Sequence, residues 1–99
     1  MSLKVGTTTP IADLIETTIL TYTAQAGDYL RGWYVMGDAI ADLLLKIQAT
    51  EVDIGLIDHD IGDMYKPIPP IALTSGYTVI ITVQKRADGS SKNFRGVIY

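Results

Sequence analysis

Short segments in which apolar and polar residues alternate with a period of two recur along this chain. Successive side chains of a strand point to opposite faces, so this period predicts strands that bury one face. The expected strands are Glu16–Thr23, Tyr29–Met36, Glu51–Ile57, Tyr77–Gln84 and Asn93–Tyr99. Turn signals that contain Gly and Asp separate them, and strands at this spacing indicate an antiparallel sandwich or a barrel.

The stretch Asp38–Gln48 fits two structures. Asp38 can cap a short helix, because its carboxylate can accept a hydrogen bond from the first free N–H groups. Alternatively the stretch forms a strand, and we favour this because predicted strands flank it on both sides. In that strand Leu43, Leu45 and Ile47 would face inward, and Asp42, Leu44, Lys46 and Gln48 would face outward.

Three further segments complete the expected layout. Residues 1–13 predict an extended N-terminal arm, either loose or pinned on a neighbouring molecule, ahead of a single domain over residues 14–99. Lys66–Ile71 is expected to run along a sheet edge, because each proline removes an N–H from the ladder. Ala87–Ser91, with its Asp-Gly pair, predicts a hairpin turn.

Composition narrows the classes of function. Apolar residues make up 47% of the chain and charged residues 19%, and this balance favours some apolar surface covered by a partner. The net charge is −3 and the cations are scattered, so nucleic-acid binding is disfavoured. The chain has no cysteine, which excludes thiolate chemistry. We expect neither a signal peptide at the N-terminus nor a membrane span, because no long apolar run occurs.

One loop carries the acidic residues that a metal would need. Asp58, Asp60 and Asp63 offer the oxygen ligands that calcium prefers, although Pro69 stands where an EF-hand would place its bidentate glutamate. A plain solvated loop is the favoured alternative, so we expect no cofactor. His59 is the only histidine, which disfavours both a zinc site and a catalytic triad, and we predict that the chain is not an enzyme.

Aromatic residues are the best candidates for contact with a partner. Tyrosine and tryptophan suit interfaces and sugar platforms because one end is apolar and the other can form hydrogen bonds. Trp33 and Tyr34 fall on opposite faces of their predicted strand, so at least one should lie off the core. Trp33 fits either the core or a partner surface, and Tyr65 is a further candidate.

Four segments, in order, resemble small jelly-roll virion proteins of tailed bacteriophages. They are Ala26–Ala39, with its Leu-x-Gly-Trp-x-Val-x-Gly strand, then Leu43–Ile47, Pro69–Val83 and Phe94–Ile98. The resemblance covers about residues 15–99, and Asp58–Met64 departs from its pattern. It implies an antiparallel two-sheet sandwich of the jelly-roll kind, with about seven or eight strands.

This resemblance also implies a function. Such modules serve as capsid decoration (cement) proteins or as receptor-binding parts of tail fibres and baseplates, and we expect the first. The expected partners are the major capsid protein and further copies of this chain, as a dimer or trimer, on the virion surface after synthesis in the host cytoplasm. A carbohydrate- or receptor-binding module is the alternative. The residues expected to contact partners are Thr7, Thr8, Thr9, Pro10, Ile11, Trp33, Tyr34 and Tyr65.

Overall fold

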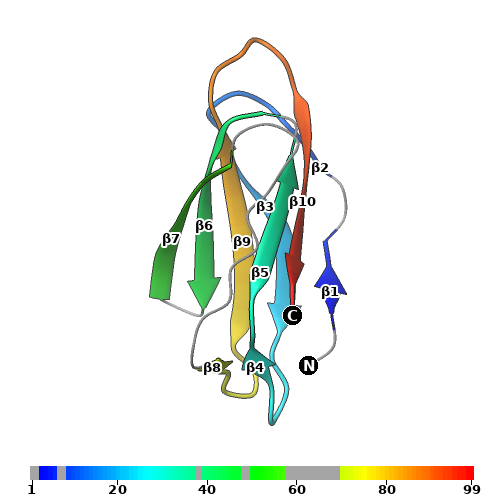
Figure 1. The fold of residues 1–99 in the computed structure, drawn as a ribbon, viewed down its shortest axis with the longest axis vertical. Coiled ribbons are helices and arrows are strands. Elements are labelled where there is room, and N and C mark those ends of the chain that lie inside the picture. The colour runs from blue at the N-terminus through cyan, green and yellow to red at the C-terminus, as the bar shows by residue number, and fades with distance from the viewer. Residues whose placement is uncertain (1–2, 7–8, 38, 48–49, 58–69) are drawn as a thin grey trace.

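The computed structural model describes residues 3–6, 9–37, 39–47, 50–57 and 70–99, and within these ranges the protein is all-β without a helix (Figure 1). The strands, in chain order, are β1 (Lys4–Val5), β2 (Thr9–Ile11), β3 (Glu16–Thr23), β4 (Tyr29–Leu30), β5 (Trp33–Gly37), β6 (Ala41–Ile47), β7 (Thr50–Ile57), β8 (Ile71–Ala72), β9 (Thr78–Lys85) and β10 (Lys92–Ile98). All their pairings are antiparallel. The predicted all-β class is therefore confirmed.

Two larger sheets organise the fold. In the first, which we call the β9 sheet, the strand order is β3-β9-β6-β7. In the second, the β10 sheet, β10 pairs with β5 on one side and with the two short strands β1 and β2 on the other. A small β4-β8 pair lies near one end of the molecule (Figure 1).

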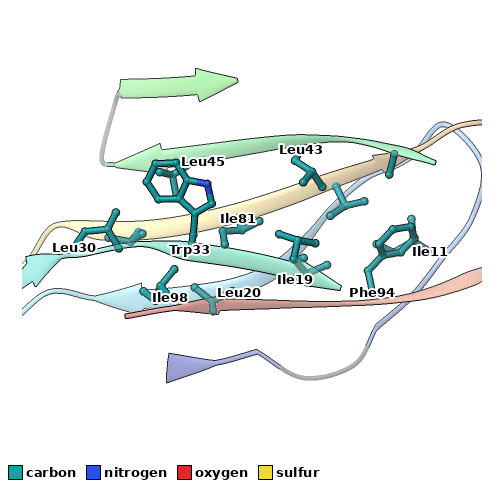
Figure 2. Packing of buried hydrophobic residues seen from close by; sticks show 14 of the residues in the cluster. Ile11, Ile19, Leu20, Leu30, Trp33, Leu43, Leu45, Ile81, Phe94 and Ile98 are labelled. Atoms are coloured by element: carbon teal, nitrogen blue, oxygen red, sulfur yellow. The ribbon is translucent and has the colours of Figure 1, made fainter. Parts of the chain in front are cut away.

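Both larger sheets contribute to one apolar core. Figure 2 shows Trp33 of β5 directed toward β6, close to Leu45, with Phe94 of β10 further along the same interior. Ile81 at the centre of β9 has no exposed surface, and neither has Ile98. Burial of such side chains contributes roughly 1.5–3 kcal/mol each, which makes this core the main source of stability.

The ambiguous stretch after Asp38 is a strand. β6 spans Ala41–Ile47, Leu43 and Leu45 are buried, and Ile47 packs against the core. The helical alternative is wrong in the described part of this stretch. Strand pairing with both β7 and β9 explains the result, because a central strand buries one whole face.

The strand expected over Tyr29–Met36 is wrong as one element. The chain breaks at Arg31 and Gly32, whose N–H groups both donate to the carbonyl oxygen of Tyr99, at 2.6 and 2.9 Å. β4 before the break pairs with β8, and β5 after it pairs with β10. The buried series shifts by one residue here, from Leu30 and Gly32 before Trp33 to Trp33 and Val35 after it, which a single strand with a period of two would not do.

The hairpin expected at Ala87–Ser91 is also wrong. Gly89 does adopt the positive φ of a turn, 82°, but β9 and β10 belong to different sheets. The segment crosses from one sheet to the other, because β9 already has β3 and β6 as neighbours and leaves no side for β10.

A bulge in β3 changes its predicted faces. In a regular strand Ile19 and Leu20 would lie on opposite faces, yet the register shifts between Thr18 and Leu20 and both side chains are buried. An extra residue in one strand of a pair produces this effect, because it turns two consecutive side chains toward the same side.

Beside this bulge the backbone of β3 lies close to the chain that follows β1. The N–H of Gly6 donates to the carbonyl oxygen of Gly96 at 2.8 Å. A Cβ atom placed on Gly6 would lie 2.1 Å from the carbonyl oxygen of Ile19. No side chain fits at this position, so the glycine is required by the close approach of two backbones.

We predict that Gly6→Ala lowers the free energy of unfolding by about 2–3 kcal/mol, because the new methyl group must displace the Ile19 carbonyl. Urea unfolding measures the change. Gly76→Ala is the control: a Cβ there meets nothing within 4 Å, and only its φ of 89° opposes the substitution. Its expected cost is about 1 kcal/mol, and an equal or smaller cost for Gly6→Ala would contradict the close approach.

Candidate functional site

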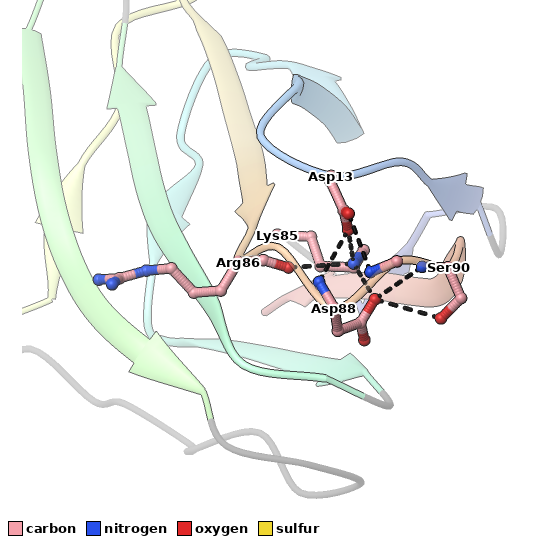
Figure 3. A network of polar contacts seen from close by, with 6 residues as sticks. Asp13, Lys85, Arg86, Asp88 and Ser90 are labelled. Atoms are coloured by element: carbon pink, nitrogen blue, oxygen red, sulfur yellow. Dashed lines mark hydrogen bonds and ion pairs between the residues drawn. The ribbon is translucent and has the colours of Figure 1, made fainter.

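A buried lysine lies at the centre of the most extensive polar cluster among the described residues. Lys85, at the end of β9, has a side chain with no exposed surface. Its Nζ donates to Asp13, to Asp88 at 2.5 Å and to the carbonyl oxygen of Arg86 at 3.0 Å (Figure 3). The two carboxylates are about one-third exposed, so the ammonium group is shielded from water while its acidic partners remain in contact with it.

The acids of this cluster are fixed by backbone N–H groups. Asp13, in the turn before β3, accepts hydrogen bonds from the N–H groups of Asp88 and Gly89, at 3.2 and 3.0 Å. Asp88 accepts from the N–H and the hydroxyl of Ser90, at 3.0 and 3.1 Å. The cluster therefore joins the connection between β2 and β3 to the connection between β9 and β10.

Leu14 shows how firmly this turn is held. Its φ is 59°, a left-handed conformation that a non-glycine residue adopts at some energetic cost. The N–H of Leu14 donates to the carbonyl oxygen of Lys85 at 2.9 Å, and its own carbonyl oxygen accepts from the side-chain amide of Gln84 at 3.0 Å. These two bonds hold Leu14 in the conformation that aims Asp13 at the ammonium group.

The cluster holds its charges firmly. Hydrogen bonds from Lys85 and from the Ser90 backbone lower the pKa of Asp88 to about 2, and the Lys85 hydrogen bond lowers the pKa of Asp13. Burial of the Lys85 ammonium group lowers its pKa. The hydrogen bonds to the carboxylates of Asp13 and Asp88 raise it by more, so the pKa of Lys85 lies above its ordinary value. A lysine that stays protonated cannot serve as a base or a nucleophile, so this arrangement acts as a structural ion cluster.

A shallow hollow of about 190 Å³ adjoins the cluster. Ala12, Asp13, Gly89, Ser90 and Ser91 line it. Within the described ranges, no three His, Cys, Asp or Glu side chains gather as metal ligands would. Asp13, the acid in this hollow, already binds Lys85 and two backbone N–H groups.

Those residues expected to contact partners that the structure describes do not lie together. Ile11 is 1% exposed and packs in the core of its own chain, where β2 pairs with β10. Pro10, beside it, is exposed. The side chain of Thr9 and the whole of Thr7, Thr8 and Tyr65 lie outside the described residues, as do Asp58, Asp60 and Asp63 of the proposed calcium loop.

Trp33 and Tyr34 separate as their positions predict. Trp33 is 6% exposed and belongs to the core, so it occupies the core and not a partner surface. Tyr34 is half-buried and lies on the opposite face of β5, which is the outer face of the β10 sheet.

Tyr34 lies in an apolar row that crosses this outer face. Val97 of β10 is paired with Tyr34 of β5 on one side and with Val5 of β1 on the other. Residues directly opposite each other in neighbouring strands share a face. Val5 is 51% exposed and Leu3, two residues earlier, is 60% exposed. Met36, paired with Arg95, extends the row along β5.

The outer face of the β9 sheet has a different character. Thr21 and Thr23 of β3 and Glu16 at its start are exposed there. Lys46 is 3.2 Å from Glu16, and Thr82 donates to the same carboxylate at 2.9 Å. This face is therefore largely polar and hydrogen-bonded within itself.

Charge also differs between the two sheets. The strands of the β10 sheet contain Lys4, Lys92 and Arg95 and no acidic residue. The strands of the β9 sheet contain four acidic residues, Glu16, Asp42, Glu51 and Asp53, against the two cations Lys46 and Lys85. The strands of the β10 sheet therefore carry only positive charge and those of the β9 sheet mainly negative charge, but Lys4 and Lys92 are paired with the buried residues Ile98 and Ile11, so only Arg95 lies on the outer face of the β10 sheet.

Comparison with known protein families, with curated proteins and with solved structures finds no match for this chain. In the part of the chain that the structure describes, no helix has the length and apolar content needed to cross a bilayer.

We predict that the double variant Asp13→Asn/Asp88→Asn is less stable than Lys85→Met. The double variant leaves an ammonium group buried without an opposite charge, whereas Lys85→Met leaves two partly exposed carboxylates that keep their backbone donors. Thermal unfolding of both variants beside the wild-type protein measures the order. If Lys85→Met were the less stable variant, loss of the ammonium group from between the two carboxylates would cost more stability than loss of the carboxylates around a buried ammonium group, which would contradict the prediction.

Low pH should lower the free energy of unfolding, because protonation of Asp88 removes its ion pair with Lys85. The pKa of Asp88 in the folded protein is about 2, below its ordinary value of 3.8, so its stabilising effect is complete above that ordinary value and is lost as the pH falls toward 2. Urea midpoints measured at several pH values from 5 to about 2 should decline in this window. The urea midpoint of Asp88→Asn should decline less steeply with falling pH than that of the wild-type protein. An equally steep decline would show that Asp88 does not contribute to the acid destabilisation.

Proposed function

We propose that this chain is a non-enzymatic viral structural protein, a capsid decoration protein that binds the outer face of a phage head. The observation that carries the proposal is the contrast between the two outer faces. One carries an apolar row with Arg95 beside it, and the other is rich in threonine and internally paired ions. This contrast suits a protein that docks on one side and meets water on the other.

The apolar face is unusual for a surface that stays in water. Val5, on the edge strand β1, and Leu3, which precedes that strand, are more than half exposed. Exposed apolar side chains on an edge strand favour pairing or packing with another chain. A lattice of such contacts would raise shell stability by avidity, although each contact alone is modest.

The order of the strands supports the jelly-roll part of the proposal. The chain passes from β3 in the β9 sheet to β5 in the β10 sheet, returns to the first sheet for β6, β7 and β9, and crosses again for β10. Repeated crossing between two layers is what a jelly roll built from Greek keys requires.

A binding experiment with shells tests this function. Phage heads assembled without this chain are mixed with the purified protein and sedimented, and the shell melting temperature is measured with and without it. We expect saturable co-sedimentation and a higher melting temperature. Absence of both would overturn the proposal, because a decoration protein must bind the assembled shell.

A carbohydrate- or receptor-binding module is the second candidate, and two exposed tyrosines favour it. Tyr29 is 45% exposed and Tyr77 is 40% exposed. Their loops meet at one end of the molecule, where the N–H of Ala24 donates to the Tyr77 carbonyl oxygen at 2.7 Å and the N–H of Leu73 to the Asp28 carbonyl oxygen at 3.0 Å. Tyrosine rings at such an end can stack on sugars. A glycan array with specific signals that Tyr29→Ala removes would support this candidate, and calcium dependence would implicate the acidic loop.

A further inference from the structure

We infer that the N-terminal arm exchanges between two copies of this chain to form a reciprocal dimer. The arm, whose described residues are 3–6 and 9–13, leaves the β10 of its own chain and takes the same position on the β10 of the second copy. The inference goes beyond the proposed function and does not depend on it, because both partners are copies of this chain.

The arm is paired with a single strand of the rest of the protein. β1 and β2 pair with β10 and with no other described strand, and β10 keeps β5 on its other side. From the arm, Ile11 inserts into the core, where it is buried. Without an arm, β10 has an open edge and the core loses a side chain, so this position requires an arm of this sequence.

Asp13 ends the arm with a charge that the rest of the protein needs. Its carboxylate binds the buried ammonium group of Lys85 and accepts hydrogen bonds from the N–H groups of Asp88 and Gly89. These donors all lie at the end of β9 or in the connection to β10. The arm of a second copy therefore restores the strand pairing, the packing of Ile11 and the ion pair together.

Leu14 is the residue that must change conformation for the arm to leave. Its φ of 59° is left-handed and strained for a residue that has a Cβ atom. Two hydrogen bonds, to the Lys85 carbonyl oxygen and from the Gln84 side chain, hold it there. An extended Leu14 loses these bonds and releases the strain, and a short connection under strain favours exchange between copies.

The length of this connection determines where the two copies meet. Asp13 and Glu16 are three residues apart, so the extended chain between them spans at most about 11 Å. Each arm can therefore reach only a β10 whose Lys85 lies close to the Lys85 of its own chain. The two copies must adjoin at this end of β9.

Exposed apolar side chains lie at the same end of the protein. Leu14 and Ile15 are both more than half exposed. Ile40 is also exposed, and its carbonyl oxygen accepts a hydrogen bond from the N–H of Arg86 at 2.9 Å, one residue after the carbonyl that holds Leu14. A reciprocal dimer places the two connections side by side about a twofold axis, so that the two copies cover each other's apolar side chains.

Two substitutions at Leu14 should change dimerisation in opposite directions. Leu14→Gly adopts a positive φ without strain and stabilises the closed monomer, so it should weaken dimerisation by about tenfold or more. Leu14→Pro cannot adopt that φ and lacks the N–H that binds Lys85, so it should strengthen dimerisation by a similar factor. Sedimentation equilibrium, after refolding from urea over a range of protein concentrations, measures the dissociation constants.

Gly27→Ala is the control for these variants. Gly27 also has a positive φ, 85°, but it follows β3, whereas Leu14 precedes that strand. The substitution introduces strain away from the arm, so the dissociation constant should change by about twofold or less. Circular dichroism shows whether each variant is folded, and if Leu14→Pro is not, Leu14→Gly and the thiol experiment below decide.

Thiol pairs identify the exchanged strands, because the chain has no cysteine of its own. Val5 and Val97 are paired across β1 and β10, so their Cβ atoms lie about 4.5–5.5 Å apart. Chains that carry Val5→Cys are refolded with chains that carry Val97→Cys, and a short bismaleimide is added. A link between the two positions then requires that the arm of one copy lies on the β10 of another.

Thr21→Cys and Ile80→Cys provide the matched thiol control. These positions are paired across β3 and β9, which do not exchange, and each pair combines one exposed and one half-buried residue. Mass spectrometry of the digested dimers identifies the linked peptides. We expect links between positions 5 and 97 and none between positions 21 and 80.

The outcomes distinguish this inference from the proposed function. Dimers without the link between positions 5 and 97, a protein that stays monomeric, or a shift of both Leu14 variants in the same direction would overturn the exchange. Binding of a monomeric protein to phage heads would still leave the decoration function standing. Arm exchange in a protein that does not bind heads would support the inference and overturn that function alone.

Discussion

An ammonium group without exposed surface needs opposite charge inside the protein, and Lys85 finds it on two separate connections. Asp13 belongs to the turn that leads from β2 into β3, and Asp88 belongs to the crossing from β9 to β10. Both connections carry the chain from one larger sheet to the other. One buried charge therefore fixes the relative position of the two sheets at this end of the core, and Gly6 fixes it elsewhere through its contact with Ile19.

The parts of the fold that depend on local alternation could be predicted from the sequence. β3 and β6 formed where the pattern indicated, with Leu43 and Leu45 inside. What depends on distant partners could not be predicted. The break at Arg31 arises because Tyr99 accepts two hydrogen bonds there, and the crossing at Ala87–Ser91 arises because β9 has neighbours on both sides. Neither cause is visible within a window of ten residues.

The site residues show the same division. Lys85 continues the inward series Val79, Ile81 and Val83, so the alternation itself indicates a buried cation at this position. Tyr34 was correctly expected on the face opposite Trp33. The row that joins it to Val5 and Val97 could not be predicted, because strand register across sixty or more residues is set by the complete sheet. The functional argument depends on that register, since scattered apolar residues alone define no surface.

The central place of β10 in its sheet has a consequence for biosynthesis. β1, β2 and β5 all pair with β10, which follows them by many residues. While the ribosome extends the chain, these earlier strands have no ladder to join, and their apolar faces depend on chaperones or on transient collapse for shelter. Once β10 emerges, three pairings close together, so assembly of this half of the molecule is a late and concerted event with the slow kinetics of non-local contacts.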